Sequence, residues 1–440
     1  MSDPISKSRK AERTFNPIRN IVDTLRPPVD HPLKFLNLAL GDPTAHGLSP
    51  PEVLLSSMHR ELDAGNYNGY LPSVGDTKAR EAIAAYASRP DLNFEVEADD
   101  VVIASGCSGA VELVIGALID EGDNILVPSP GFPLYQVIIN SLGGLSKHYN
   151  LIPEKSWECD LDSMEQLIDN RTKAILINNP SNPCGAVYSQ SHLEAIGALA
   201  KKHNLPIIAD EIYGGIVFEG SFFPMAACAP DVPVISMGGL AKEFVCPGWR
   251  VGWITLHDKQ ANNRLSVVRG GIKSLTQLIV GANSLVQACI PSVLTPSSED
   301  AAKLSNYAKK YIGLLESNSK TIIEELSSYD LLSVIEPQGA MYAMVRLHLD
   351  KMVGIKDDRD FAKDLLQEEN LIVLPGACFG LDNFVRILTC PAEDTVKEAL
   401  ERMKRFCDKR QIQQGSQKRE GDKESNGETH GHKRPKNGHK

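Results

Sequence analysis

Short apolar runs alternate with helical patterns through the middle of the chain. The runs hold four or five residues, mostly Val, Ile, Leu or Ala, and lie at 100–104, 124–127, 173–177, 206–209, 234–237 and 251–254. Runs that are apolar throughout are typical of strands covered on both faces. Helical patterns follow at 110–118 and from Ser191, where Ser191 and Glu194 have the spacing of a capping box. The alternation predicts an α/β fold with helices on both sides of a mostly parallel sheet.

The C-terminal part of the chain has a different pattern. A long helical pattern starts at about Tyr311 and leads into a second, α+β unit that ends near Cys407. The last 32 residues, 409–440, contain nine Lys/Arg, four Asp/Glu and a single large aliphatic residue. Such a segment buries too little apolar surface to fold, so a disordered tail is predicted. Its basic patch at 433–436 is either a nuclear-targeting or anion-binding element or, more simply, part of a solubilising tail.

Charge and cysteine usage narrow the class of protein. The formal net charge of −10 argues against a protein that binds nucleic acid. There is no run of about 18 apolar residues, and residues 1–13 lack the apolar segment of a secretory signal, so no membrane association is predicted. The nine cysteines form no Cys-x-x-Cys pair and have no His at metal-ligand spacing. We therefore expect free thiols, no metal site and a cytoplasmic location.

Polar segments rich in Gly and Pro come directly after five of the predicted strands. They lie at 105–109, 128–133, 178–185, 210–213 and 238–242. In open α/β sheets, ligands bind outside the carboxyl ends of the strands. Five such segments at one edge of the sheet predict one large site.

Three of these segments hold groups suited to chemistry, but each has a simpler explanation. Small residues at 105–109 let backbone N–H groups reach an anion, although a tight turn explains them equally well. Asp210 ends an apolar strand and needs a partner such as a protonated pyridine nitrogen, unless it only caps a turn. Lys242 follows small residues, as a desolvated nucleophile would, yet an isolated lysine is usually a surface charge.

The order and spacing of several motifs are more specific. The sequences Asn-Asn-Pro-Ser-Asn-Pro-Cys-Gly at 178–185, Ala-Asp-Glu-Ile-Tyr at 209–213, Lys242 and Pro-Gly-Trp-Arg at 247–250 follow one another along the chain. Together they resemble the fold-type-I aminotransferases, which use pyridoxal 5′-phosphate (PLP), over about residues 15–407. The segments that are similar to the tyrosine-type members of this family lie at 14–19, 40–44, 67–70, 153–158 and 339–342.

This resemblance implies a division into domains. An N-terminal arm would occupy residues 1–30, and the region 16–32 would lie beside the substrate entrance. A large PLP-binding domain would span 71–310. A small domain would combine 31–70 with 311–407, followed by the tail at 408–440.

The resemblance also implies roles for individual residues. Lys242 would carry the cofactor as a Schiff base and act in catalysis with Asp210 and Tyr213. Asp210 would pair with the pyridine nitrogen, Asn182 and Tyr213 would bind the ring hydroxyl, and Phe132 would stack on the ring. The phosphate would be bound by Gly106, Cys107, Ser108 and Arg250, and by Tyr70 of a partner subunit in a homodimer. The substrate carboxylate would be bound by Arg386, Gly41 and Asn182. Some relatives have a phosphate-binding serine where this chain has Gly239, so the phosphate would depend more on Arg250 and Ser108.

The implied reaction is a ping-pong transfer of an amino group between amino acid and 2-oxo acid substrates. Tyrosine, or phenylalanine, would be the donor and 2-oxoglutarate the acceptor, so that tyrosine gives 4-hydroxyphenylpyruvate and glutamate. Lys242 and Asp210 would equally serve a carbon–sulfur lyase or an aminocyclopropanecarboxylate synthase of the same fold. A non-catalytic interaction protein is a further alternative, although such proteins commonly lose the lysine or the aspartate that this chain keeps.

Overall fold

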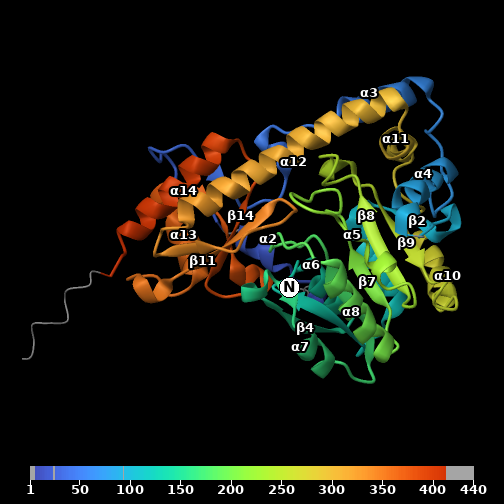
Figure 1. The fold of residues 1–440 in the computed structure, drawn as a ribbon, viewed down its shortest axis with the longest axis horizontal. Coiled ribbons are helices and arrows are strands. Elements are labelled where there is room, and N and C mark those ends of the chain that lie inside the picture. Colours follow the sequence, from blue (N-terminus) through green and yellow to red (C-terminus); the bar gives the residue numbers. More distant parts are fainter. Residues whose placement is uncertain (1–4, 23–24, 93, 413–440) are drawn as a thin grey trace, which may run out of the picture.

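The computed structural model describes residues 5–22, 25–92 and 94–412, and an eight-stranded sheet forms its centre (Figure 1). From edge to edge the strands are β2 (Val101–Ala104), β9 (Gly252–His257), β8 (Val234–Gly239), β7 (Ile207–Asp210), β6 (Thr172–Asn178), β3 (Asn124–Ser129), β4 (Leu145–Ile152) and β5 (Glu158–Cys159). Strands β8, β7, β6, β3 and β4 are parallel, whereas β9 is antiparallel to both neighbours and β5 to β4. The predicted α/β fold with a mostly parallel sheet is confirmed.

Helices cover both faces of this sheet, which explains why its strands are apolar throughout. Successive residues of a strand face opposite sides; Ile208 packs in one apolar cluster and Ile207 in another. The Ile208 side is covered by α5 (Gly106–Leu118), α6 (Leu134–Ser141) and α10 (Ser266–Thr276). The opposite side is covered by α8 (Gln190–Lys202), α9 (Met225–Cys228), α3 (Glu52–Ala64), α4 (Thr77–Ala87) and α11 (Ser284–Leu294). The short α7 (Leu161–Gln166) contacts β4.

A second sheet has its own apolar core. Its antiparallel strands are β10 (Leu332–Val334), β11 (Tyr342–Leu347), β14 (Phe384–Leu388) and β13 (Leu374–Pro375). A separate parallel pair joins β1 (Leu36–Asn37) to β12 (Leu371–Ile372), which ties the N-terminal region to the C-terminal one. The helices α13 (Asp358–Glu369) and α14 (Glu393–Asp408) pack here, and the long α12 (Ser298–Leu326) runs from α3 and α11 to this second sheet (Figure 1).

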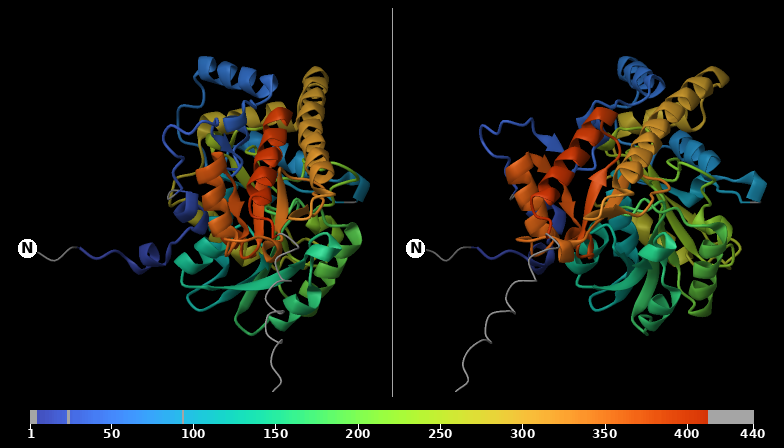
Figure 2. Two further views of the ribbon diagram at one scale, coloured as in Figure 1. Left: turned by 90° about the vertical axis from the view of Figure 1, so that its left-hand side faces the viewer. Right: turned by 60° about the vertical axis from the view of Figure 1, so that its left-hand side comes forward.

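The N-terminal segment projects outward from the body of the molecule in both views of Figure 2. It contains α1 (Arg9–Arg13) and α2 (Pro17–Val22). Helix α1 lies against α6, and the Arg13 guanidinium donates to Glu121 at 2.6 Å. Helix α2 lies near the carboxyl edge of the large sheet, where Ile18 packs with residues of the second unit.

Two predicted helix starts were wrong. Helix α8 begins at Gln190, because Ser189 rather than Ser191 accepts the backbone N–H of His192 as the N-cap. Helix α12 begins at Ser298 instead of about Tyr311, with Ser297 as its N-cap. Its first turns are mostly exposed, so they have no apolar stripe that could show them in the sequence.

Two further differences concern the large sheet. Residues 106–109, expected as a turn, form the first turn of α5, which begins directly after Ser105. Strands β4 and β5 were not among the predicted strands. Strand β4 lies near the edge of the sheet and is only partly buried, so it has no continuous apolar run.

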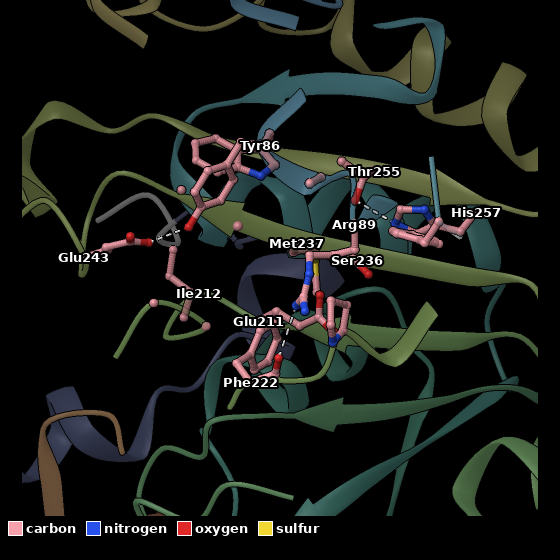
Figure 3. A pocket seen from close by; sticks show the side chains of 18 of the residues that line it. Tyr86, Arg89, Glu211, Ile212, Phe222, Ser236, Met237, Glu243, Thr255 and His257 are labelled. Atoms are coloured by element: carbon pink, nitrogen blue, oxygen red, sulfur yellow. Dashed lines mark hydrogen bonds between the residues drawn. The ribbon is translucent and has the colours of Figure 1, made fainter. Parts of the chain in front are cut away.

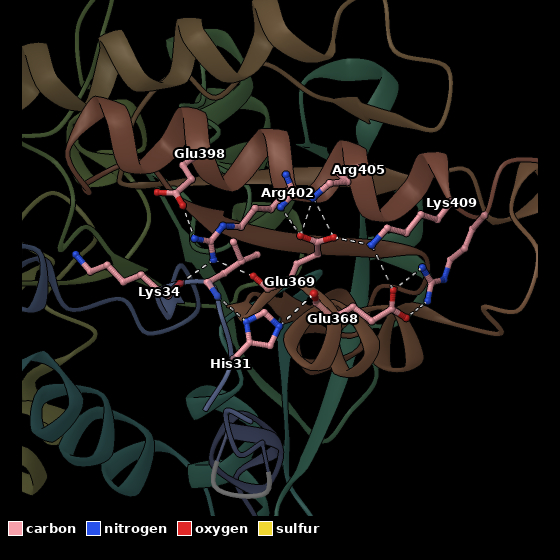
Figure 4. Close-up of polar contacts among 10 residues, drawn as sticks. His31, Lys34, Glu368, Glu369, Glu398, Arg402, Arg405 and Lys409 are labelled. Carbon is pink, nitrogen blue, oxygen red and sulfur yellow. Dashed lines mark hydrogen bonds and ion pairs between the residues drawn. The ribbon is translucent and has the colours of Figure 1, made fainter. Parts of the chain in front are cut away.

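Residues 409–412, which the prediction assigned to the tail, pack against the folded chain. The carboxylate of Glu369 accepts hydrogen bonds from the Arg405 Nε and the Lys409 Nζ, both at 3.0 Å, and Arg410 pairs with Glu368 (Figure 4). These ion pairs hold Lys409 and Arg410 against α13, and backbone hydrogen bonds join 410–412 to 351–353. Residues 413–440, including the basic patch, lie outside the described residues. No helix in the described ranges has the length and apolar character needed to cross a lipid bilayer.

Candidate active site

A cavity of about 350 Å³ lies at the carboxyl edge of the large sheet, and we call it the front cavity. The segments after β2, β3, β6, β7 and β8 all contribute to its wall. They supply Cys107, Phe132, Asn182, Tyr213 and Lys242 respectively. Residues from the second sheet and from α2 complete the wall. The structure thus brings the five predicted segments together around one cavity.

Most of the predicted site residues line the front cavity. They are Gly41, Cys107, Ser108, Phe132, Asn182, Asp210, Tyr213, Lys242, Arg250 and Arg386. Gly106 lies just behind the wall with a left-handed φ of 74°, and a Cβ there would collide with the Arg250 guanidinium. Tyr70 is 91% exposed and does not line the cavity of its own chain.

Asp210 is a buried carboxylate at the end of β7. Its Oδ2 accepts the Tyr135 hydroxyl at 2.6 Å, and its Oδ1 accepts the backbone N–H of Ile212 at 3.2 Å and the Cys107 thiol at 3.6 Å. Burial raises the pKa of Asp210, while these hydrogen bonds act in the opposite direction. A cationic group in the cavity would therefore be stabilised by this carboxylate.

Lys242 follows β8 and points toward the second sheet. Its Nζ donates a hydrogen bond to the Gly41 carbonyl at 2.8 Å, and none of the described carboxylates forms an ion pair with it. The Gly41 position is tight, because a Cβ there would lie 2.6 Å from the Tyr342 hydroxyl. The lysine amine is thus held at the cavity wall by one neutral acceptor, which a ligand can replace.

Arg386 on β14 is a buried cation that pairs with no carboxylate of the described residues. It is 3% exposed, and its Nη1 and Nη2 donate to the Asn182 side chain at 2.9 Å and the Ala39 carbonyl at 2.7 Å. Its buried Nε has no hydrogen-bond partner among the described residues. Burial lowers the pKa of this guanidinium. Burying an unpaired charge is costly, so a carboxylate from a ligand would satisfy this site.

The other end of the cavity is suited to an anion. Helix α5 begins at Gly106, so its first N–H groups have no acceptor within the helix. Arg250, with a left-handed φ of 54°, lies across this helix end and donates to the Pro247 carbonyl at 2.9 Å. A guanidinium beside a helix N-terminus is an arrangement that favours phosphate.

Three residues at the site had no predicted role. Tyr135 donates to Asp210; Tyr342 hydrogen-bonds the Tyr213 hydroxyl at 2.8 Å; and the Asn178 side chain accepts the backbone N–H of Asn182 at 2.7 Å. Burial raises the pKa of Tyr213 well above its usual range, so its hydroxyl stays protonated at neutral pH. Asn178 and Tyr342 lie inside the quoted motifs, whereas a tyrosine in the apolar helix α6 gives no comparable signal.

Comparison with known proteins agrees with this geometry. The family model "Aminotransferase class I and II" matches residues 34–403. A tyrosine aminotransferase of Dictyostelium discoideum is 41% identical over 406 residues, covering 92% of this chain and 96% of the relative. The human tyrosine aminotransferase is 40% identical, covering 92% and 87%. The crystal structure of tyrosine aminotransferase from Leishmania infantum superposes with a TM-score of 0.86 at 35% identity, covering 94% of this chain and 100% of that one. The chain belongs to the aminotransferase class I and II family.

Proposed function

We propose that this aminotransferase transfers the amino group of tyrosine, and of phenylalanine, to 2-oxoglutarate. The observation that carries the proposal is the buried, unpaired guanidinium of Arg386, which lines the same cavity as Lys242 and Asp210. Amino acids and 2-oxo acids share an α-carboxylate, so one arginine serves both half-reactions. The choice of tyrosine is supported by the tyrosine aminotransferases at about 40% identity.

The cofactor implied by the family is PLP, and the front cavity fits it. Asp210 would hold the protonated ring nitrogen, since a buried carboxylate is stabilised by a cation. Arg250 and the first turn of α5, with Gly106, Cys107 and Ser108, would hold the phosphate. Tyr213 and Asn182 would bind the ring hydroxyl, and Phe132 would cover one ring face.

PLP, when bound, withdraws electrons from the substrate Cα and so makes its proton acidic. Arg386 and Gly41 orient the substrate through its carboxylate, which places the Cα–H bond toward Lys242. The Lys242 Nζ removes this proton in the first half-reaction and returns a proton to Cα when the oxo acid becomes an amino acid. Tyr213 stays protonated, and its hydroxyl would donate into the cavity when the Tyr342 hydroxyl, 2.8 Å away, is the donor of the bond between them.

A panel of amino donors with 2-oxoglutarate tests this proposal. We expect glutamate to form fastest with tyrosine, to form with phenylalanine, and to be accompanied by 4-hydroxyphenylpyruvate in equal amount when tyrosine is the donor. Ammonia or a thiol without glutamate would instead show a lyase of the same fold. Glutamate from other donors but not from tyrosine would refute the aromatic preference.

The same proposal includes a homodimer in a reducing, cytoplasmic setting. Tyr70 is exposed. Four apolar side chains on and directly after α10 are exposed as well: Val267, Leu278, Ile279 and Val280. A second copy covering them would bring the partner's Tyr70 to the phosphate end of the cavity. The nine free cysteines suit a reducing compartment. Equilibrium sedimentation should give a dimer; an active monomer would contradict this.

We also propose that the two sheets mark the large and small domains, with the boundaries predicted from the sequence.

A further inference from the structure

A second cavity, of about 440 Å³, lies on the opposite face of the large sheet, and we call it the rear cavity (Figure 3). It is bounded by the end of α4, by β8 and β9, and by the segment after β7. Two of its lining residues, Glu211 and Glu243, directly follow Asp210 and Lys242 in the sequence. Each pair of neighbours thus sends one side chain to the front cavity and the next to the rear.

The two carboxylates of the rear cavity lack cationic partners. Glu211 accepts the backbone N–H of Met225 at 2.8 Å, and Glu243 accepts the Tyr86 hydroxyl at 2.8 Å (Figure 3). None of the described Lys, Arg or His side chains forms an ion pair with either carboxylate. Arg89 lies in the same wall, but it is engaged by the Asp91 carboxylate and by the Phe222 carbonyl. When these carboxyl groups are ionised, the unpaired charge of this cavity is therefore negative.

A further polar group at this cavity is left without a partner. The Ser236 side chain on β8 lines the wall and is 6% exposed, and its hydroxyl has no hydrogen-bond partner among the described residues. The Ser236 hydroxyl lies close to the Glu211 carboxylate and acts to lower its pKa. The geometry of the two groups is nevertheless not that of a hydrogen bond. A buried hydroxyl is normally bonded, so this one indicates a polar ligand group in the cavity.

The rest of the wall is aromatic. Tyr86 and Trp253 meet edge to face with ring centroids 6.4 Å apart, and Phe94 and Phe222 also line the cavity. Aromatic rings and carboxylates together bind organic ammonium groups, through cation–π attraction and ion pairing. A metal ion fits this cavity less well. In the described part of the chain, no group of three His, Cys, Asp or Glu side chains could hold one.

We propose that the rear cavity binds a small organic cation, in which a protonated amine pairs with the Glu211 carboxylate next to Ser236 and an apolar body packs against the aromatic wall. This inference does not depend on the substrate of the front cavity. It explains the unpaired Glu211 carboxylate, the unbonded Ser236 hydroxyl and the aromatic lining with one ligand.

Protonation of the cavity gives this site a measurable signature. The titratable or charged groups in its wall are Glu211, Glu243, Tyr86, His257 and Arg89, the last paired with Asp91. Burial raises the pKa of Glu211 to about 7 and also raises that of Glu243, while it lowers the pKa of His257 to about 4. At pH 7 a bound cation will draw protons off the carboxyl groups. Binding should therefore release protons and strengthen as the pH rises from 6 to 8.

The test is calorimetric titration of the PLP-loaded full-length protein with N,N-dimethylbenzylamine. This tertiary amine is protonated at neutral pH and cannot form an imine with PLP. The neutral control is N,N-dimethylbenzamide, which has a similar size and shape. We expect the amine to bind at least tenfold more tightly than the amide, with proton release seen as a dependence of the heat on the ionisation enthalpy of the buffer.

Conservative variants locate the binding. Glu211→Gln and Glu243→Gln keep the shape and the accepted hydrogen bonds but remove the charge. Glu211→Gln should weaken amine binding at least tenfold, and Glu243→Gln should weaken it less. The matched control is Glu219→Gln, whose side chain is 84% exposed and lies outside the cavity. Retained thermal unfolding and PLP absorbance show that a variant is folded.

Two results would overturn the proposal. One is equal binding of amine and amide to the wild-type protein, a comparison that needs no variant to fold. The other is amine binding that survives unchanged in both glutamine variants, which would place the amine elsewhere, for instance in the front cavity.

Discussion

The front and rear cavities are lined by neighbouring residues yet carry opposite unpaired charges. Asp210 and Lys242 face the front cavity, where the guanidinium of Arg386 has no carboxylate partner. Glu211 and Glu243 face the rear cavity, where two carboxylates have no cation. Asp210 and Glu211 are neighbours in the sequence, as are Lys242 and Glu243, yet the two members of each pair line different cavities. The two cavities therefore differ in the charge of the ligand that each can accept.

This contrast shows how to deduce ligand charge from a structure without ligands. A charge that is buried in the folded chain costs free energy unless something pairs with it. The front cavity lacks an anion next to Arg386 and at the start of α5, which fits a carboxylate and a phosphate. In the rear cavity, none of the described cationic side chains pairs with Glu211 or Glu243, which fits an organic cation. The following changes test each side of the comparison.

The largest effect is expected at the lysine of the front cavity. Lys242→Ala removes the group that moves the Cα proton, so kcat for transamination should fall by about 10⁴-fold or more. Steady-state glutamate formation measures this. Lys201→Ala is the control, because Lys201 is 61% exposed and pairs only with Asp231; its kcat should not change. A Lys242→Ala enzyme with more than a tenth of wild-type kcat would refute the assignment.

The next effect concerns the unpaired guanidinium. Arg386→Lys keeps the charge but loses bidentate recognition, so kcat/KM for both the amino donor and 2-oxoglutarate should fall by about 10²-fold or more. Arg346→Lys provides a control on the adjacent strand β11, since Arg346 is 39% exposed and pairs with Glu154. A loss for only one of the two substrates would show that they do not share Arg386.

The rear cavity should reveal its unpaired charge through the pH dependence of stability. The pKa of Glu211 is raised by burial to about 7, so its contribution to stability is fully present below about pH 4.5 and is lost as the pH rises through 7. Relative to Glu211→Gln, the free energy of unfolding of the wild type should decline by up to about 3 kcal/mol between pH 4.5 and 8. Urea unfolding at several pH values measures it, with Glu219→Gln as control. Parallel wild-type and Glu211→Gln curves would contradict a raised pKa of Glu211.

The smallest effect is expected for a residue that acts through Asp210. Tyr135→Phe removes a hydrogen bond that lowers the pKa of Asp210. Its kcat should fall about fivefold, and the acid limb of the kcat profile should move to higher pH. Tyr149→Phe also removes a buried hydroxyl bond, to the Leu176 carbonyl, but should leave this profile unchanged. Identical profiles for the two variants would make Tyr135 merely structural.

The sequence predicted the strands around the front cavity because strands buried on both faces have continuous apolar runs. Asp210 ends one of these strands and Lys242 follows another closely. The order of strands and helices was therefore enough to predict that both lie at the same edge of the sheet. Arg386 could not, because it comes from the second sheet, and only the family resemblance indicated its role.

Contacts between distant segments account for what the sequence could not show. Tyr135 meets Asp210 only because α6 packs over the end of β7, and Glu243 meets Tyr86 across 157 positions of sequence. Neither pair has a local pattern. The rear cavity is therefore a product of tertiary packing, although its two carboxylates directly follow Asp210 and Lys242 in the sequence.

The measurement that tests the central claim most directly is borohydride reduction of the PLP-loaded protein, followed by peptide mass spectrometry. Reduction fixes the cofactor on whichever amine holds it. We predict a phosphopyridoxyl group on the peptide that contains Lys242, and its absence when saturating tyrosine is present before reduction. A cofactor fixed on another lysine, or no adduct on a PLP-loaded protein, would contradict the account.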